Sequence, residues 1–198
     1  MMSRKNVQEE RRLQIFNALH SILLTKPFHE LSTRELASMA EVNHGMLYYF
    51  FNSKEDILLQ FIDYTIEKYS KTFSDWLQEN WIGNKLDQTF INDLFAFISQ
   101  KITFNMDLSK IFIEIWAVAN YSETVRDKLK ALYDEWEKRA TEMLIKSGLD
   151  KKSAEIVSTV IVTSFEGVSL FSILQKERIT HFTEILMWHR DRIIDLIP

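Results

Sequence analysis

The residues best suited to chemistry in this chain surround a short segment, 44–50, and their chemistry is that of binding. His44 can donate or accept a hydrogen bond, and the amide of Asn43 matches the donor and acceptor that adenine presents in the major groove. Asn43 can instead serve only as the N-cap of a helix that begins at His44. Tyr48 and Tyr49 offer hydroxyls that suit phosphate oxygens, contacts that position a protein on DNA without reading its sequence. This combination is typical of a nucleic-acid interface.

Three neighbouring residues extend this set. Gly45 is costly inside a short helix unless the backbone must approach something closely, although a helix also tolerates a single glycine. Met46 offers an apolar contact to a thymine methyl group. Lys54 begins a later helix, where the ammonium group and the helix N-terminus together suit a phosphate, but it can equally be a solvated surface lysine.

Two short helices must position these groups. The capping box Ser32–Glu35 predicts a helix over 33–40, and Asn43 begins a second over 44–50. Leu47 and Phe51 are four residues apart, so they share one face of the second helix, which we expect to be buried. Helices this short are not stable alone in water, so they must pack on each other. A tight helical pair with a short link is the unit that places a helix in the major groove of DNA.

A specific pattern runs through this segment: LSTRELA at 31–37, then Val42, Gly45, Leu47, Tyr48, Phe51, Ser53 and Lys54. With this pattern, about a quarter of the chain resembles the N-terminal helix-turn-helix of the tetracycline-repressor (TetR) family. Members of that family are usually homodimeric repressors that a small ligand releases. The resemblance also implies that Thr33 and Arg34 contact phosphate and sometimes a base. Arg34 can instead pair with a neighbouring acid such as Glu30.

The chain departs from the family pattern at three positions. Glu41 occupies a turn where glycine is usual, and a positive φ there would cost roughly 1 kcal/mol. Met46 replaces a small hydroxyl residue, and Phe50 replaces a polar ring. These changes affect the operator sequence more than DNA binding itself.

An enzymatic or metal-binding function is disfavoured by the motifs. His181 and Glu184 form H-x-x-E, and Glu41 and His44 form E-x-x-H, but the second motif falls in the predicted DNA-binding segment. A di-iron bundle needs such motifs on two helices plus two further carboxylates. The sequence has no H-E-x-x-H, P-loop or G-x-S-x-G. We therefore expect no catalytic site, no metal and no cofactor.

A ligand pocket is expected in the second part of the chain. Phe112, Trp116 and Asn120 follow each other at four-residue spacing, as two aromatic walls with one amide. Phe165 can face them from a later helix. Stripes of aromatic residues are nevertheless more often core. Glu166 can receive a cationic ligand, although the resemblance favours a structural role for the Glu166-Gly167 step. Another acid in an apolar helix, Glu114, can pair with Lys110 instead.

The last two predicted helices are candidates for dimerisation. Between 156 and 174, apolar residues spread around more than one helical face, as in a helix buried on both sides. One side would meet the rest of the chain and the other a second subunit. The expected interface residues are Val160, Val168, Phe171, Ile185 and Trp188.

The composition supports a DNA-binding module on an acidic body. The 198 residues include no cysteine, which excludes disulfides and thiolate metal sites. Residues 1–54 carry seven basic and five acidic residues, whereas the remainder carries 17 and 23. This contrast is expected if only the first module touches phosphate. No signal peptide is apparent, and no apolar stretch approaches the roughly 20 residues of a membrane span, so we expect a cytoplasmic protein without a membrane partner.

Four glycines and two prolines in the whole chain favour an almost entirely helical structure. We expect an all-α fold of about nine helices, with a three-helix DNA-binding head in 1–53 and a helical bundle for ligand binding and dimerisation in 54–198. Further helices are expected to begin at the caps Ser53, Ser122, Asp150 and Thr180, and Gly148 to end one of them.

The sequence therefore predicts a ligand-responsive transcriptional regulator, a repressor that binds a pseudo-palindromic operator as a homodimer. Its partners would be double-stranded DNA and a small hydrophobic effector. The alternative is a helical interaction or ligand-binding protein that has lost sequence-specific DNA binding.

Overall fold

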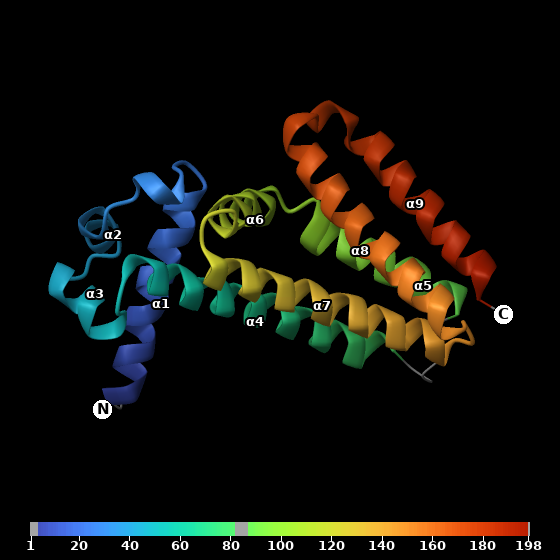
Figure 1. The fold of residues 1–198 in the computed structure, drawn as a ribbon, viewed down its shortest axis with the longest axis horizontal. Helices are drawn as coiled ribbons and strands as arrows, with labels where there is room; N and C mark the ends of the chain where they lie inside the picture. The colour runs from blue at the N-terminus through green and yellow to red at the C-terminus, as the bar shows by residue number, and fades with distance from the viewer. Residues whose placement is uncertain (1–3, 82–86, 198) are drawn as a thin grey trace.

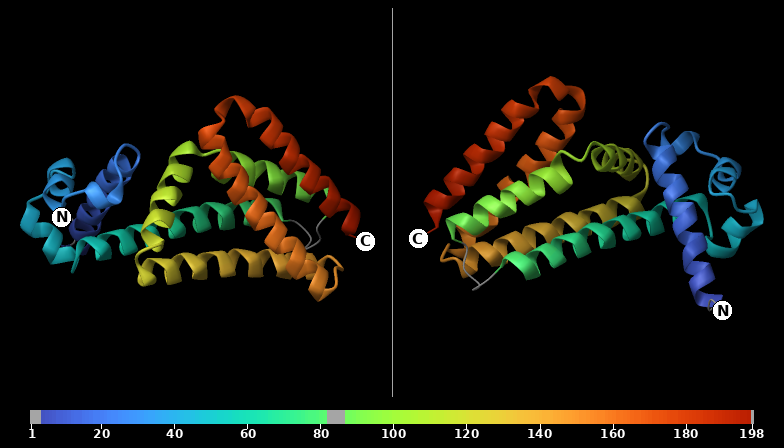
Figure 2. Two further views of the ribbon diagram at one scale, coloured as in Figure 1. Left: turned by 45° about the horizontal axis from the view of Figure 1, so that its top comes forward. Right: turned by 180° about the vertical axis from the view of Figure 1, so that it is seen from behind.

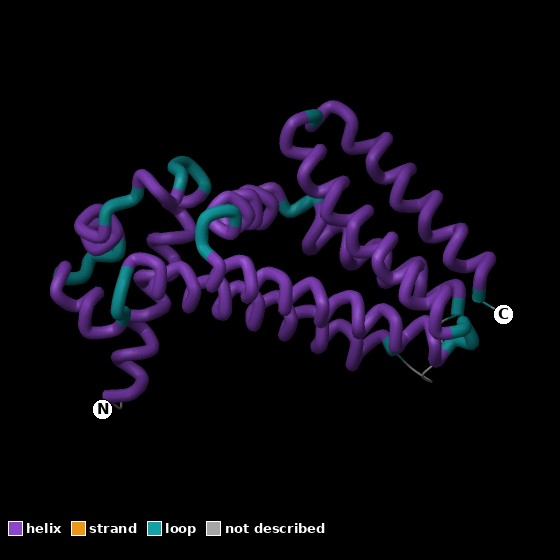
Figure 3. The backbone as a smooth tube through the Cα atoms, in the orientation of Figure 1, coloured by secondary structure: helices purple, strands orange, loops and turns teal. Residues whose placement is uncertain are grey.

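The computed structural model describes residues 4–81 and 87–197, and every regular element in these ranges is helical (Figure 3). The nine α-helices of the described residues are α1 (Arg4–Leu23), α2 (Thr33–Met39), α3 (His44–Phe50), α4 (Lys54–Asn80), α5 (Gln88–Ile98), α6 (Met106–Ala119), α7 (Glu123–Lys146), α8 (Lys151–Leu174) and α9 (Ile179–Leu196). Two 3-10 turns, Phe28–Glu30 and Lys176–Arg178, and a π-helical turn, Ser99–Thr103, complete these elements. The all-α prediction is confirmed.

Side-chain caps begin most helices at the predicted residues. The Ser32 hydroxyl accepts a hydrogen bond from the Glu35 N–H at 3.1 Å, so α2 begins as the capping box indicates. Caps in the same relation begin α4, α7 and α8, at Ser53, Ser122 and Asp150, and Asn43 caps α3 by accepting from the residue two positions on. These caps satisfy backbone N–H groups that otherwise lack a partner within the helix.

The predicted cap at Thr180 is wrong. Helix α9 begins at Ile179, and no side chain caps it. The 3-10 turn Lys176–Arg178 leads directly into this helix, so the residues before its first turn are already helical. Thr180 consequently lies inside the helix.

Two turns adopt the left-handed backbone conformation. Gly148 ends α7 with φ of 102°, as predicted for a C-terminal glycine. Glu41, in the link between α2 and α3, has φ of 53°. A side chain at this φ is strained, and the predicted cost of roughly 1 kcal/mol at Glu41 therefore applies.

The head lies at one end of the molecule and consists of α1, α2, α3 and the start of α4 (Figure 1). Helix α4 extends from the head along the body beside α7, and it contacts α7 on the way. Helices α8 and α9 form a neighbouring pair that lies farthest from the head (Figure 2). The long α4 therefore links the DNA-binding segment to the rest of the chain.

The buried residues form two clusters. The proximal cluster joins the head to the start of α4 and to α6 and α7, with residues such as Leu19, Leu58, Phe61, Ile111 and Val125 that are at most 1% exposed. The distal cluster joins α5, the end of α7, α8 and α9. Because the proximal cluster crosses residue 54, the head and the first part of the body share one core.

Helix α8 is more apolar than expected. Its 24 residues are long and apolar enough to cross a membrane by length and composition, with a mean hydropathy of 1.7 over the best window. The expectation that no segment reaches this length is therefore wrong, because the hydroxyl residues of α8 lower its hydropathy only slightly. The helix packs against α6, α7 and α9. An apolar core helix passes the same length and composition test.

Candidate DNA interface and effector cavity

Helix α3 is held on the head by one apolar face and exposes the other. Leu47 is 1% exposed and Phe51 is 2% exposed, and both belong to the proximal core. Tyr48 and Tyr49 on the opposite side are 57% and 67% exposed. Figure 1 shows α2 and α3 at the end of the head that is farthest from α8 and α9. The outer face of α3 is therefore accessible to a large partner.

Three predicted DNA-binding residues meet on the outer surface of α2 and α3. The Thr33 hydroxyl lies 3.0 Å from Nε2 of His44 and 3.4 Å from the Tyr48 hydroxyl. The rings of His44 and Tyr48 meet edge to face, with centroids 5.2 Å apart. We call Thr33, His44 and Tyr48 the polar triad. The triad gathers two hydroxyls and an imidazole, groups that can contact phosphates and base edges.

Asn43 serves as the N-cap of α3. Its Oδ1 accepts a hydrogen bond from the Gly45 N–H at 2.8 Å. A bidentate contact to adenine would have to share this oxygen with the cap, because the same oxygen accepts in both. A Cβ on Gly45 would lie 3.3 Å from that oxygen, so the cap gives a local reason for glycine in addition to the approach of DNA.

The other predicted residues flank the triad. Arg34 is exposed at the start of α2. The ion pair of Arg34 with Glu30, the alternative to a phosphate contact, is not formed in the described part of the chain. Glu30 instead lies 3.7 Å from His29. Met46 lines a shallow hollow between α3 and α1. The Tyr49 hydroxyl accepts a hydrogen bond from Gln8 of α1 at 2.9 Å. This contact from α1 was not foreseen, because residues 41 apart in the sequence give no local pattern.

Lys54 contacts residues outside the polar triad. Its ammonium group donates to the His29 carbonyl at 3.2 Å and lies 4.6 Å from the centre of the Phe28 ring. Burial, and then the nearby Lys26, lowers the pKa of Lys54. A phosphate contact by Lys54 remains a prediction. The phosphate would have to share the ammonium group with the His29 carbonyl, which lies in the 3-10 turn before α2.

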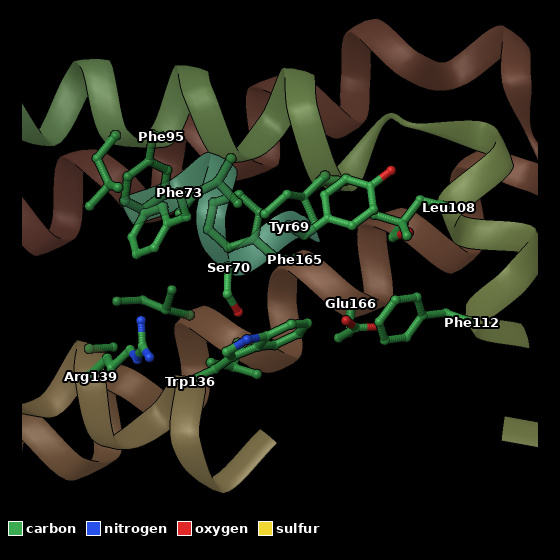
Figure 4. A pocket seen from close by; sticks show the side chains of 18 of the residues that line it. Tyr69, Ser70, Phe73, Phe95, Leu108, Phe112, Trp136, Arg139, Phe165 and Glu166 are labelled. Atoms are coloured by element: carbon green, nitrogen blue, oxygen red, sulfur yellow. The ribbon is translucent and has the colours of Figure 1, made fainter. Parts of the chain in front are cut away.

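A cavity of about 210 Å³ lies within the body (Figure 4). Its walls come from α4, α5, α6, α7, α8 and α9 and from the π-helical turn. Most of the lining is apolar, including Phe73, Phe95, Phe112, Trp136 and Phe165. A dry apolar cavity of roughly 150 Å³ can hold benzene, so this cavity has room for a small aromatic molecule.

Only half of the predicted pocket residues line this cavity. Phe112 and Phe165 do, whereas Trp116 is half-exposed and Asn120 is exposed. A residue eight positions along an α-helix is rotated by about 80° from the first, so the stripe turns away from the cavity. The Trp116 indole N–H instead donates to the Tyr133 hydroxyl at 3.1 Å, and the Asn120 amide donates to the Trp116 carbonyl.

Two charged side chains are among the described residues that line the cavity, Glu166 and Arg139. Burial raises the pKa of Glu166, and the nearby Tyr133 hydroxyl offsets part of that rise. Arg139 donates to Glu135 at 2.7 Å on the outer side of α7. The sequence pattern did not identify Arg139, Trp136 or the contributions from α4, because the walls come from helices far apart in the chain.

Helix α6 connects the cavity to the head. Phe112 of α6 lines the cavity, and two residues later Glu114 accepts a hydrogen bond from the Phe28 N–H at 3.1 Å. Ser122 at the start of α7 donates to Glu55 at the start of α4. The expected surface pair of Glu114 with Lys110 is not formed among the described residues; Glu114 contacts the head instead.

The predicted dimer residues divide into two groups. Val160, Phe171 and Trp188 are 42%, 50% and 60% exposed. Val168 is buried in the chain's own distal core, and Ile185 packs against the same core. Leu170 and Leu174, which the prediction did not include, add exposed apolar surface to α8. Helices α8 and α9 thus present apolar side chains outward.

Comparison with known proteins agrees with this geometry. Residues 15–61 match the model of the bacterial regulatory proteins of the tetR family. Residues 88–180 match the model of the C-terminal domain of LmrA/YxaF-like transcriptional regulators. The chain belongs to the TetR family, whose members are DNA-binding transcriptional regulators.

Individual proteins resemble this chain in sequence or in fold. An uncharacterised HTH-type transcriptional regulator from Xanthobacter autotrophicus is 25% identical over 186 residues, covering 92% of this chain and 88% of the relative. A TetR regulator from Haloarcula marismortui has a TM-score of 0.76 at 18% identity, covering 96% and 98% of the two chains. FadR of Bacillus subtilis, solved with stearoyl-CoA, has a TM-score of 0.72 at 14% identity, covering 94% and 99%.

Proposed function

We propose that this chain is a homodimeric repressor that leaves its operator when a small apolar effector enters the cavity. The observation that carries the proposal is the double role of α6, which lines the cavity through Phe112 and contacts the head through Glu114. An effector that displaces α6 would move the head, because α6 contacts the head through Glu114 and both contribute to the proximal core.

DNA contact is assigned to the exposed face of α3 and the start of α2. The polar triad would contact phosphates and base edges, with Arg34 and Tyr49 at its margin. Two such heads in a homodimer would enter successive major grooves about 34 Å apart on a pseudo-palindromic operator. A protein that binds chromosomal DNA in this way acts in the cytoplasm.

The second subunit is assigned to the apolar surface of α8 and α9. Exposed Val160, Leu170, Phe171, Leu174 and Trp188 form this surface, and large exposed apolar patches commonly mark protein interfaces. Burial of this surface in a dimer also accounts for the high hydropathy of α8.

The effector is assigned to an apolar class from the aromatic lining of the cavity. The family relative from Bacillus subtilis was solved with stearoyl-CoA, which supports a ligand role for the corresponding body domain. The chain shares its fold with that relative at low identity, so its ligand is not transferred to this chain.

Selection of bound fragments from the source genome tests the proposal. The purified full chain should enrich fragments that carry a pseudo-palindrome, often near its own gene, and a fluorescent fragment should then report release by candidate effectors. A protein that enriches no fragment, or that is monomeric at micromolar concentration, would favour the alternative of a helical protein that has lost sequence-specific DNA binding.

A further inference from the structure

We propose that the cavity selects a small organic cation, with the ammonium group against the Glu166 carboxylate and the apolar part among the aromatic rings. This inference rests on the proposed function, since it names the chemical class of the effector for the same cavity. It goes beyond that function because an apolar lining alone would accept a neutral ligand equally well.

Glu166 is the acidic side chain among the described residues of a mostly apolar wall. It lies on α8 between residues of the distal core, and its carboxylate faces the cavity beside Phe112 (Figure 4). Among the described residues it makes no ion pair. A partly buried carboxylate without a cationic partner is costly, and an ammonium group would supply the missing charge.

The other charged residue of the lining is already compensated. Arg139 lies apart from Glu166 in Figure 4, with Trp136 between them. Its guanidinium donates to Glu135 at 2.7 Å. An acidic ligand would have to compete with Glu135 for Arg139, whereas a cationic ligand meets an acid that has no basic partner. The charges therefore favour a cation over an anion.

The rings around Glu166 suit a cation as well. The Phe112 and Trp136 rings have centroids 6.2 Å apart, and Tyr133 meets Trp136 edge to face at 5.4 Å. Aromatic faces attract ammonium groups, and tryptophan does so most strongly. The Tyr133 hydroxyl accepts from Trp116, so its own proton is available for the Glu166 carboxylate.

This arrangement also explains how the free protein tolerates the acid. Burial raises the pKa of Glu166, so this acid is more easily protonated than an exposed glutamate. A bound ammonium group would act in the opposite direction and favour the ionised carboxylate. The binding of a cation should therefore lower the pKa of Glu166.

Three probes of similar size separate the ligand classes. Benzyltrimethylammonium is cationic, neopentylbenzene has the same shape without the charge, and 3-phenylpropanoate is anionic. Trp136 lies in the cavity wall, so tryptophan fluorescence of the full-length chain should follow binding. We expect the cation to bind at least tenfold more tightly than either of the other two.

Variants then assign the preference to Glu166. Glu166→Gln keeps the shape of the side chain and should reduce the cation preference over neopentylbenzene to threefold or less, while neopentylbenzene still binds. Glu142→Gln, an exposed position on α7, is the matched control and should leave the preference unchanged. Trp136→Leu should weaken cation binding several-fold, which provides a second test if Glu166→Gln folds poorly.

The proposal is overturned if the cation fails to bind, if the neutral or anionic probe binds as tightly, or if the preference survives in Glu166→Gln. Such results leave the repressor proposal intact when a neutral or anionic compound still releases DNA. A chain that binds the cation selectively but enriches no DNA would instead contradict the repressor proposal alone.

Discussion

The proximal and distal halves of the molecule are packed differently. The proximal core around Phe61, Leu58 and Ile111 consists of side chains that are at most 1% exposed. The distal region surrounds the cavity and includes buried polar atoms without a hydrogen-bond partner, on Trp81, Asn92 and Thr103. A close-packed region transmits displacement, whereas a hollow region can change shape around a ligand. This difference fits a rigid DNA-binding head joined to an adaptable effector site.

The largest expected effect compares one phenylalanine in each region. Phe61→Ala removes a ring that is 1% exposed and should lower the free energy of unfolding by about 3–5 kcal/mol. Phe112→Ala removes a partly buried ring that already borders the cavity, so it should cost at least about 1 kcal/mol less. Chemical denaturation of both variants measures the difference. Equal losses would show that the two regions are packed alike.

A smaller effect is expected at the contact between body and head. Glu114→Gln weakens the hydrogen bond to the Phe28 N–H, which should cost about 1–3 kcal/mol of stability. It should also reduce the change in DNA affinity that an effector causes, because α6 would be less firmly attached to the head. Glu142→Gln on the surface of α7 serves as the control. If effector response is normal in Glu114→Gln, the coupling runs through another contact.

The effect at the polar triad should be similar or smaller. Tyr48→Phe removes one hydroxyl from an exposed ring and should weaken DNA binding by about 0.5–1.5 kcal/mol, with no loss of thermal stability. Tyr121→Phe, which changes another exposed ring, should leave Kd unchanged. Fluorescence anisotropy at two salt concentrations measures both. An unchanged DNA affinity in Tyr48→Phe would show that the Tyr48 hydroxyl does not contact phosphate.

The smallest expected effect concerns pH. The pKa of Glu166 is raised in the folded state, so between its ordinary value of about 4.3 and the raised value the folded protein binds more protons. Stability from this group is therefore present at low pH and lost as pH rises through the folded pKa. Glu166→Gln should remove this part of the pH dependence of stability.

The two tyrosines near the cavity titrate well above this range. Tyr133 and Tyr69 have pKa values raised above that of ordinary tyrosine. Thermal unfolding of the unmodified chain and of Glu166→Gln should be compared from pH 4 to 8. The difference between them measures the contribution of the Glu166 carboxyl group. Identical pH profiles would show that its carboxyl group has the same pKa in folded and unfolded chains.

The sequence predicted the head more accurately than the body, for a local reason. The bounds of α3 matched because Asn43 caps its start and the next cap, Ser53, follows closely after its end. Lys54 was predicted to be free for phosphate, yet it contacts Phe28 and His29 across a gap of 25 residues. Contacts of this kind depend on tertiary packing and leave no pattern in neighbouring residues.

The body was harder to predict because the described cavity lining is assembled from six α-helices. Phe112 and Phe165 were identified as pocket residues, but regular spacing over eight residues led to Trp116 and Asn120, which lie outside the lining. The predicted interface residues include both exposed and buried side chains. Hydrophobicity alone could not tell Val168, which faces the chain's own core, from Phe171, which faces outward.

The most direct test of the account is a DNA titration with the polar triad removed. The triple variant Thr33→Val, His44→Ala and Tyr48→Phe should keep its helical content and dimer mass but bind a selected genomic fragment at least a hundredfold more weakly than the unmodified chain. Equal affinity of the variant and the unmodified chain would contradict the assignment of α3 as the helix that reads DNA.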